Sequence, residues 1–309
     1  MLKSHYIFLL LLLASNTVVF AQNRPIKDTS YTITSAYNKA LKKYPDISIA
    51  KTRDTSIVKY TPNIAYKTTP NYSLYLDAFI NTKNTNAPAV ILIHGGGWKS
   101  GSKSLLHPLA SVLAANGYNS FTIEYRLAPQ NKFPDAVSDV FDAISFIKTQ
   151  AATYNINPEQ LIILGSSSGA QIASLVATTA HKPIFTKTPV NIKGLVNIDG
   201  ILAFSHPKSE EGTLAASWLG DTETNNPELW KQASALTYVD QNCPPTLFIP
   251  SNFERFQAGR DEMIAILEQH HIYYKISAVH NAPHTFWLFN PWFDSVADST
   301  INFLNYILK

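Results

Sequence analysis

The chain is poor in cysteine, and Cys243 is its one cysteine among 309 residues. It can therefore form no disulfide within the chain, and it cannot build a thiolate metal site. No HExxH motif or other close grouping of histidines and carboxylates occurs either, so we expect no metal and no cofactor. Cys243 comes just before an apolar run, and we interpret it as a small buried residue.

Long basic tracts are also missing. Lysine and arginine number 25 against 22 acidic residues, which gives a formal net charge of +3. No cluster of basic residues is dense enough to indicate a nucleic-acid surface, so we expect no nucleic-acid partner. Apolar residues make up 45% of the chain and charged residues 15%, which is typical of a globular protein with a large core.

The chain begins with an apolar segment, MLKSHYIFLLLLLASNTVVFAQ. Lys3 gives it a positive start, and Val19-Phe20-Ala21 has the pattern of a cleavage site. We interpret residues 1–21 as a signal peptide cleaved after Ala21, and predict a secreted or periplasmic protein. A membrane anchor is the alternative, but the unbroken apolar run is shorter than the ~20 residues that a span needs. We expect no membrane span once the signal peptide is removed.

Patterns typical of strands and helices alternate along most of the remaining chain. Predicted strands cover residues 73–80, 87–98 up to a glycine break, 119–125, 160–165, 190–199, 245–250 and 272–279. Predicted helices cover residues 103–117, 134–152, about 169–180, 258–270 and 293–308. The alternation predicts an α/β fold with a mostly parallel sheet covered on both faces. We assign this domain to residues 57–309, with residues 22–56 as a leader packed on it and residues 203–240 as a possible cap insert.

A G-x-S-x-G motif, Gly165-Ser166-Ser167-Ser168-Gly169, joins the strand at 160–165 to the next helix. A sharp strand–turn–helix context of this kind is a nucleophile elbow, which exposes the side chain of the central serine. The N–H of Ser168 then lies at the start of the helix, where it can donate to an oxyanion. The motif predicts that Ser167 is a nucleophile.

A second glycine-rich break, HGGGW at residues 94–98, ends an earlier strand. Glycines there leave backbone N–H groups open to a ligand, because no Cβ stands in the way. Both breaks follow the C-terminal ends of strands, which is the edge where α/β folds bind ligands. We expect the N–H groups of Gly96, Gly97 and Ser168 to form an oxyanion hole, and we interpret His94 as a structural residue.

In order along the chain, HGGGW, EYRLAP (124–129), FPDAVSDV (133–140) and G-x-S-x-G resemble the hormone-sensitive-lipase-like branch of the α/β-hydrolases. That branch includes many bacterial carboxylesterases and carbohydrate esterases. The resemblance extends over about residues 57–309 and implies the α/β-hydrolase fold with a Ser–His–acid triad. Ser166 and Ala170 depart from the branch, which often has an acid and a glycine at these positions.

The order of the triad in this fold places the histidine late in the chain, after the acid. The segment VHNAPHTFWLF offers His280 and His284. His284 is followed by Thr285 and Phe286, as in the family's loop, and we predict it as the base.

The acid has three candidates. Families of this fold usually place it shortly after the penultimate strand, where Glu254 stands, and we predict Glu254. Asp199, at the end of the strand at 190–199, and Asp261, at the start of a helix, remain alternatives.

These residues together predict a serine esterase that acts through an acyl-enzyme. Export and the aromatic segment at 286–293 favour removal of acetyl or feruloyl groups from plant polysaccharide. The expected substrate is a small ester or an acylated oligosaccharide. A general short-chain carboxylesterase or lipase is the alternative. A non-catalytic binding protein with this fold is disfavoured by the presence of the serine, the histidine and the glycine donors.

Overall fold

The computed structural model describes residue 28, residues 30–53 and residues 56–309. The signal peptide expected at residues 1–21 lies outside these residues, so its prediction stays untested. No helix within the described ranges is long and apolar enough to cross a membrane.

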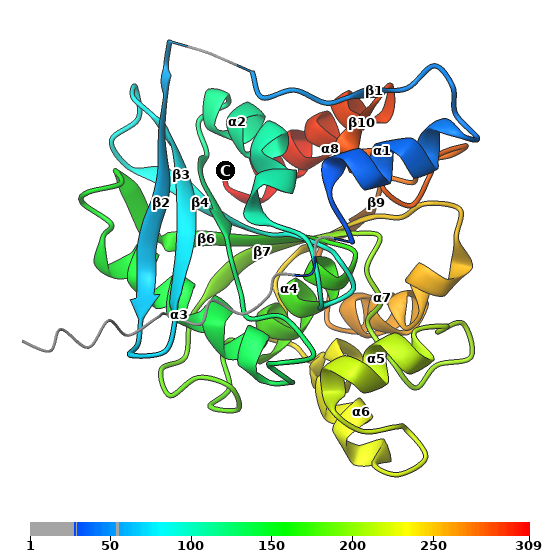
Figure 1. The fold of residues 1–309 in the computed structure, drawn as a ribbon. Coiled ribbons are helices and arrows are strands. Elements are labelled where there is room, and N and C mark those ends of the chain that lie inside the picture. The colour runs from blue at the N-terminus through cyan, green and yellow to red at the C-terminus, as the bar shows by residue number, and fades with distance from the viewer. Residues whose placement is uncertain (1–27, 29, 54–55) are drawn as a thin grey trace, which may run out of the picture.

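An eight-stranded sheet forms the centre of the fold, in the order β2-β3-β5-β4-β6-β7-β8-β9 (Figure 1). β2 and β3 and also β3 and β5 pair antiparallel, whereas every further pair, from β5–β4 to β8–β9, is parallel. The predicted mostly parallel sheet is therefore present. The strands are β2 (Val58–Thr68), β3 (Ser73–Asn81), β4 (Ala87–Ile93), β5 (Asn119–Ile123), β6 (Ile156–Ser166), β7 (Ile192–Ile198), β8 (Thr246–Ile249) and β9 (Tyr274–Ile276).

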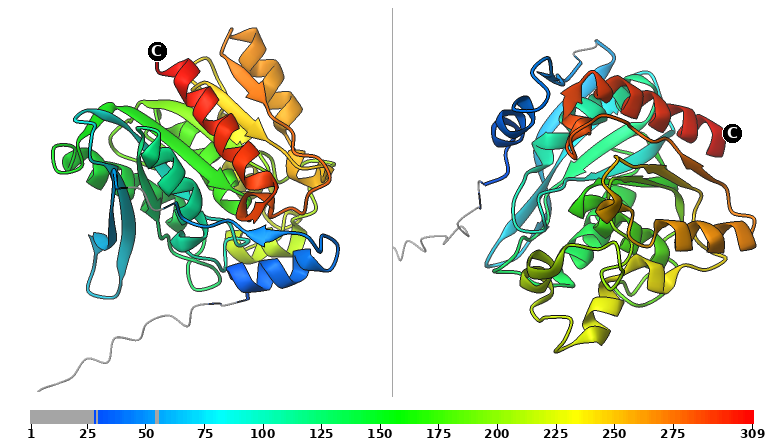
Figure 2. Two further views of the ribbon diagram at one scale, coloured as in Figure 1. Left: turned by 90° about the horizontal axis from the view of Figure 1, so that it is seen from above. Right: turned by 90° about the vertical axis from the view of Figure 1, so that its right-hand side faces the viewer.

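Helices cover both faces of the sheet, as the two views of Figure 2 show. One face is covered by α1 (Ile33–Leu41), α2 (His107–Ala115) and α8 (Trp292–Ile307), and the other by α3 (Asp135–Thr149), α4 (Ser168–Thr179) and α7 (Arg260–Gln269). Along β4, Ile91 packs into the second layer, while Val90 and Leu92 pack into the first. Because both faces are covered, this strand is a continuous apolar run rather than an alternating one.

The described part of residues 22–56 is structured. Helix α1 begins at a capping box made by Thr32 and Ser35. The short strand β1 (Ser48–Ile49) pairs with β10 (Phe289–Asn290) in a two-stranded sheet. This segment also contributes buried side chains to the layer of α2 and α8, namely Ala36, Ala40, Ile47 and Ala50.

Residues 203–240 carry α5 (Gly212–Leu219), α6 (Pro227–Ala233) and the 3₁₀ turn η2 (Ala235–Tyr238). Trp218 of α5 stacks on Trp98 of the HGGGW segment, with 5.2 Å between ring centroids. Gln171 of α4 accepts a 2.9 Å hydrogen bond from Trp98 Nε1 and donates another of 2.9 Å to the carbonyl of Ala233. These contacts tie the insert to the glycine-rich loop and to the helix after Ser167.

The EYRLAP and FPDAVSDV motifs meet in a buried cluster of ion pairs, to which they contribute Arg126 and Asp139. Asp139 of α3 is fully buried, and it accepts hydrogen bonds from Arg126 Nε at 2.8 Å and Arg126 Nη2 at 2.9 Å. Lys67 of β2 donates a further bond of 2.8 Å to the same carboxylate. A buried charge is tolerated when it is paired and hydrogen-bonded. These contacts hold α3 against the sheet, because they join Asp139 to Lys67 of β2 and to Arg126 in the segment after β5.

Candidate active site

Ser167 lies in the sharp turn between β6 and α4. Its backbone has φ 53° and ψ −126°, and this positive φ in a sparsely populated region costs ~1–3 kcal/mol for a residue with a side chain. A Cβ on Gly165 would collide with the backbone of Gly169, so the strand and the helix can cross this closely only at glycine. The N–H of Ser167 donates to the carbonyl of Ile198 at 2.8 Å. The turn is therefore fixed, and it presents the Ser167 side chain to a cavity.

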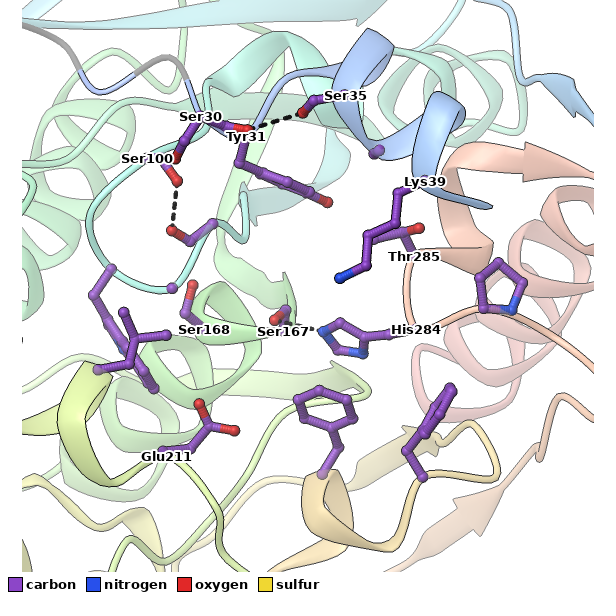
Figure 3. A pocket seen from close by; sticks show the side chains of 18 of the residues that line it. Ser30, Tyr31, Ser35, Lys39, Ser100, Ser167, Ser168, Glu211, His284 and Thr285 are labelled. Carbon is purple, nitrogen blue, oxygen red and sulfur yellow. Dashed lines mark hydrogen bonds between the residues drawn. The ribbon is translucent and has the colours of Figure 1, made fainter. Parts of the chain in front are cut away.

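His284 lies in the loop between β9 and the 3₁₀ turn η4 (Phe286–Leu288). Its Nε2 atom is 2.8 Å from Ser167 Oγ (Figure 3). Phe256 stacks on the imidazole with 3.6 Å between ring centroids, and Trp287 meets it edge-on at 5.2 Å. His280 is exposed and contacts Asn252 instead. The structure thus brings His284 rather than His280 to Ser167.

Asp199, at the end of β7, holds the other side of the ring. Its Oδ2 atom lies 2.6 Å from His284 Nδ1, and its side chain is fully buried. Ser251 donates to the same carboxylate from its N–H at 2.8 Å and from its hydroxyl at 2.7 Å. Because an ionised carboxylate only accepts hydrogen bonds, His284 carries its proton on Nδ1. Nε2 is then free to accept the proton of Ser167.

The prediction that Glu254 is the acid is wrong in this geometry. Glu254 is exposed at the start of the 3₁₀ turn η3 (Glu254–Gln257), which follows β8. The loop after β8 brings Ser251 to Asp199 and Phe256 to His284, whereas the hydrogen bond to His284 Nδ1 comes from Asp199. The segment contributes a hydrogen-bond donor and an aromatic ring to the site, while the carboxylate comes from the end of β7.

Asp261 is excluded as well. It is exposed in the first turn of α7 and forms ion pairs with Arg260 at 2.7 Å and Lys208 at 3.2 Å. Hydrogen bonds from Arg260 hold the pKa of this carboxyl below its usual range. An acid in the first turn of a helix is stabilised by the helix dipole and requires no catalytic explanation.

The glycine-rich loop after β4 lies directly against Ser167. A Cβ on Gly95 would come within 2.9 Å of the Cβ of Ser167. Gly96 and Gly97 have φ +136° and +60°, which favour glycine, and both line the same cavity as Ser167. Ser168 also lines this cavity and is the first residue of α4, where the N–H groups have no partner within the helix. The three predicted donors thus belong to residues that line the same cavity as Ser167, and their role in binding an oxyanion stays a prediction.

The cavity around Ser167 and His284 has a volume of about 870 Å³. Besides Ser167, His284 and the residues next to them, four segments that are distant in sequence contribute to its walls. The glycine-rich loop lies beside Ser167, α1 and the residues before it form a second wall, the insert adds a third, and the loop after β8 adds the fourth. Tyr31 and Lys39 belong to the wall at α1, Glu211 and Leu214 to the insert, and Phe253 and Arg255 to the loop after β8.

The aromatic residues at 286–293 do not line this cavity. Phe286, Trp287, Phe289 and Phe293 are buried in the layer of α2 and α8, where they pack the core. The rings at the cavity come from other segments, and among them Phe253 is 42% exposed. Sequence reasoning did not identify these rings, because their segments meet only in the folded chain.

No group of three or more histidine, cysteine, aspartate or glutamate residues that could hold a metal ion occurs in the described part of the chain. Cys243 is buried as expected, and burial raises the pKa of its thiol to about 11. Since the thiolate is the reactive form, this cysteine is a poor nucleophile near neutral pH. The chemistry that the cavity can support is proton transfer from Ser167 to His284, with Asp199 stabilising the imidazolium.

Comparisons with known proteins relate this chain to one protein family and to several esterases. The BD-FAE family model matches residues 76–258. Among curated proteins, a probable carboxylic ester hydrolase of Mycobacterium tuberculosis, LipM, is 30% identical over 170 residues, which are 52% of this chain and 39% of LipM. The chain thus spans about two fifths of the length of the first curated relatives that it matches.

Solved structures with the same fold include two esterases. Esterase B from Lactobacillus Rhamnosis is 20% identical with a TM-score of 0.69, and the match covers 89% of this chain and 90% of esterase B. A truncated carbohydrate esterase from gut microbiota is 19% identical with a TM-score of 0.67, covering 84% of this chain and 100% of that one. At these identities the likeness establishes the α/β-hydrolase fold.

Proposed function

The chain belongs to the BD-FAE family, and from this membership and the contacts of His284 we propose that it hydrolyses carboxylic esters with Ser167 as the nucleophile. The observation that carries the proposal is the position of His284, whose two ring nitrogens contact Ser167 and Asp199 at 2.8 and 2.6 Å. The names of the relatives support it, since LipM is described as a probable carboxylic ester hydrolase.

The first half of the reaction acylates Ser167. Ser167 Oγ attacks the ester carbonyl carbon while its proton moves to His284 Nε2, and Asp199 stabilises the imidazolium that forms. The carbonyl oxygen becomes an oxyanion, which the N–H groups of Gly96, Gly97 and Ser168 bind. When the intermediate collapses, the C–O bond to the alcohol breaks, and His284 gives its proton to the departing alcohol.

The second half releases the acid. Water takes the place of the alcohol, His284 removes one of its protons, and the oxygen attacks the acyl carbon. The bond to Ser167 Oγ breaks and His284 returns the proton to the serine. The products are one carboxylic acid and one alcohol, and the enzyme returns to its starting protonation state.

The substrates that we propose are acyl esters on plant polysaccharide, with acetyl or feruloyl groups and an acylated oligosaccharide as the form bound. A fold neighbour described as a carbohydrate esterase supports this, and so does a cavity of about 870 Å³, large enough for more than a simple ester. The exposed ring of Phe253 beside the cavity is suited to stacking on a sugar. Secretion or export to the periplasm, through cleavage after Ala21, is part of the same proposal.

A general short-chain carboxylesterase or lipase is the second candidate. The names of LipM and esterase B favour it, since neither refers to carbohydrate. Both candidates use the same catalytic residues and differ in the ester that is hydrolysed.

The two candidates are separated by assaying p-nitrophenyl acetate, acetylated xylan and acetylated pectin with the wild-type protein. We expect hydrolysis of all three, with released acetate measured directly for the polysaccharides. Turnover of the aryl ester alone would favour the general carboxylesterase.

We also expect EDTA to leave each rate unchanged, because the proposed steps use only side chains and backbone N–H groups. A loss of activity in EDTA that zinc restores would contradict the mechanism.

A further inference from the structure

Glu211 brings a buried carboxyl group to the catalytic cavity. It lies just before α5 in the insert, is 7% exposed, and lines the same cavity as Ser167 and His284 (Figure 3). Its Oε1 atom is buried and has no hydrogen-bond partner within the described part of the chain. The nearest cation, Arg255, has its Nη2 atom 3.8 Å from Oε1, which is too long for a hydrogen bond.

Such a group is costly to a folded protein. Buried carboxyl oxygens are almost always hydrogen-bonded, and an exception calls for an explanation. Burial raises the pKa of Glu211, while the positive charge of Arg255 opposes the rise. The last torsion of a glutamate side chain is broad and nearly two-fold, so either oxygen can turn toward a donor that enters the cavity.

The other charges at the cavity limit what that donor is. Lys39, Lys43, Lys99 and Arg255 line the cavity, and Glu211 is the one acidic residue in its described lining. Figure 3 shows Lys39 reaching into the cavity from α1. Four cations disfavour an ammonium group on the substrate, because like charges repel at short range. A neutral hydroxyl group donates a hydrogen bond without adding charge.

We propose that Glu211 accepts a hydrogen bond from a hydroxyl group of the substrate, and that it determines specificity for esters of polyhydroxylated alcohols. The inference rests on the proposed ester hydrolysis and adds a residue that recognises the alcohol. The acceptor then gains its missing partner only when the substrate is bound. A substrate without the hydroxyl leaves the carboxyl unsatisfied, which is how a polar site rejects an apolar analogue.

A matched pair of esters tests this role. Glycerol monobutyrate and propyl butyrate share the acyl group and the carbon chain of the alcohol, and they differ only in hydroxyl groups. In Glu211→Met, we expect kcat/KM for glycerol monobutyrate to fall about 10- to 100-fold, with propyl butyrate changed less than about threefold. Glu211→Ala should give the same selective loss, whereas Glu211→Gln, which retains an acceptor, should keep most of the preference.

Glu210→Gln is the matched control. Glu210 is exposed, lies 3.7 Å from the same Arg255, and does not line the cavity. Removing its charge should leave the ratio of the two esters unchanged. An equal loss on both esters in Glu211→Met and Glu211→Ala would mean a structural role and overturn the inference. The same holds if their ester ratio matches that of the wild-type protein. Failure of the wild-type protein to hydrolyse either ester would instead contradict the proposed function itself.

Discussion

Replacing Ser167 with alanine is expected to lower kcat for p-nitrophenyl acetate by a factor of about 10⁴ to 10⁶. The substitution removes the oxygen that lies 2.8 Å from His284 Nε2, and no other nucleophile takes its position. Alanine and serine bear the same steric cost at φ 53°, so the turn itself is retained. The measurement is steady-state turnover, with the melting temperature expected to stay within about 2 °C of the wild-type value.

Ser166→Ala is the matched control for this result. The Ser166 hydroxyl is buried and lacks a hydrogen-bond partner among the described residues, so its removal leaves no group newly unsatisfied. We expect its turnover to remain within about tenfold of the wild-type rate. Equal losses in Ser166→Ala and Ser167→Ala would mean that the nucleophile has been assigned to the wrong serine.

The second large effect is expected for Asp199→Asn, with kcat lowered about 10³- to 10⁴-fold. The asparagine amide can turn its NH₂ group toward His284 Nδ1, and the proton of the ring then moves to Nε2. In that tautomer the ring cannot accept the proton of Ser167. Because Asp199 contacts the histidine and not the cavity, KM should change little while kcat falls, and steady-state kinetics separate the two.

Glu254→Gln and Asp261→Asn are the controls for the acid. Both side chains are exposed and have no contact with His284. Each variant should keep its turnover within about threefold of the wild-type rate. A loss of about 100-fold or more in Glu254→Gln, with Asp199→Asn near wild type, would restore the assignment that the structure rejects.

The serine and histidine of the site could be predicted from local sequence. The G-x-S-x-G motif lies between an apolar strand and a helix. Gly165 is required there, because a Cβ at this position would collide with the backbone of Gly169. Chain order leaves His280 and His284 once the fold is assigned, and the two residues after His284, which resemble the family's loop, favour His284. Both inferences depend on segments of a few residues, which is the range over which a sequence pattern fixes geometry.

The acid could not be predicted in the same way. β7 and β8 are neighbouring parallel strands, so Asp199 and Glu254 follow two strands that end at the same edge of the sheet. Offset along the sequence does not tell which loop turns inward. The choice depends on Ser251, whose N–H and hydroxyl bind the Asp199 carboxylate and direct it to His284.

Parts of the fold at the edges were also missed. β2 is an edge strand with many exposed residues, and its pairing with β3 shifts register between Thr61 and Ile64, around Pro62 and Asn63. That shift breaks the alternation by which a strand is identified. The sequence predicts a leader at residues 22–56 and a possible cap at residues 203–240, without the residues that they contribute to the cavity. Their cavity residues, Lys39 and Glu211, join the site through tertiary packing alone.

Mass spectrometry of the protein treated with an activated phosphonate ester tests the central claim most directly. The phosphonate phosphorus is attacked as an ester carbonyl would be, and the adduct cannot be hydrolysed readily. We predict one adduct per chain, located on Ser167 by peptide mapping. In Asp199→Asn the adduct should form more slowly, in proportion to the loss of activity, and in Ser167→Ala no adduct should form. Full inhibition with the adduct on another residue, or unchanged turnover once Ser167 is fully labelled, would contradict the account.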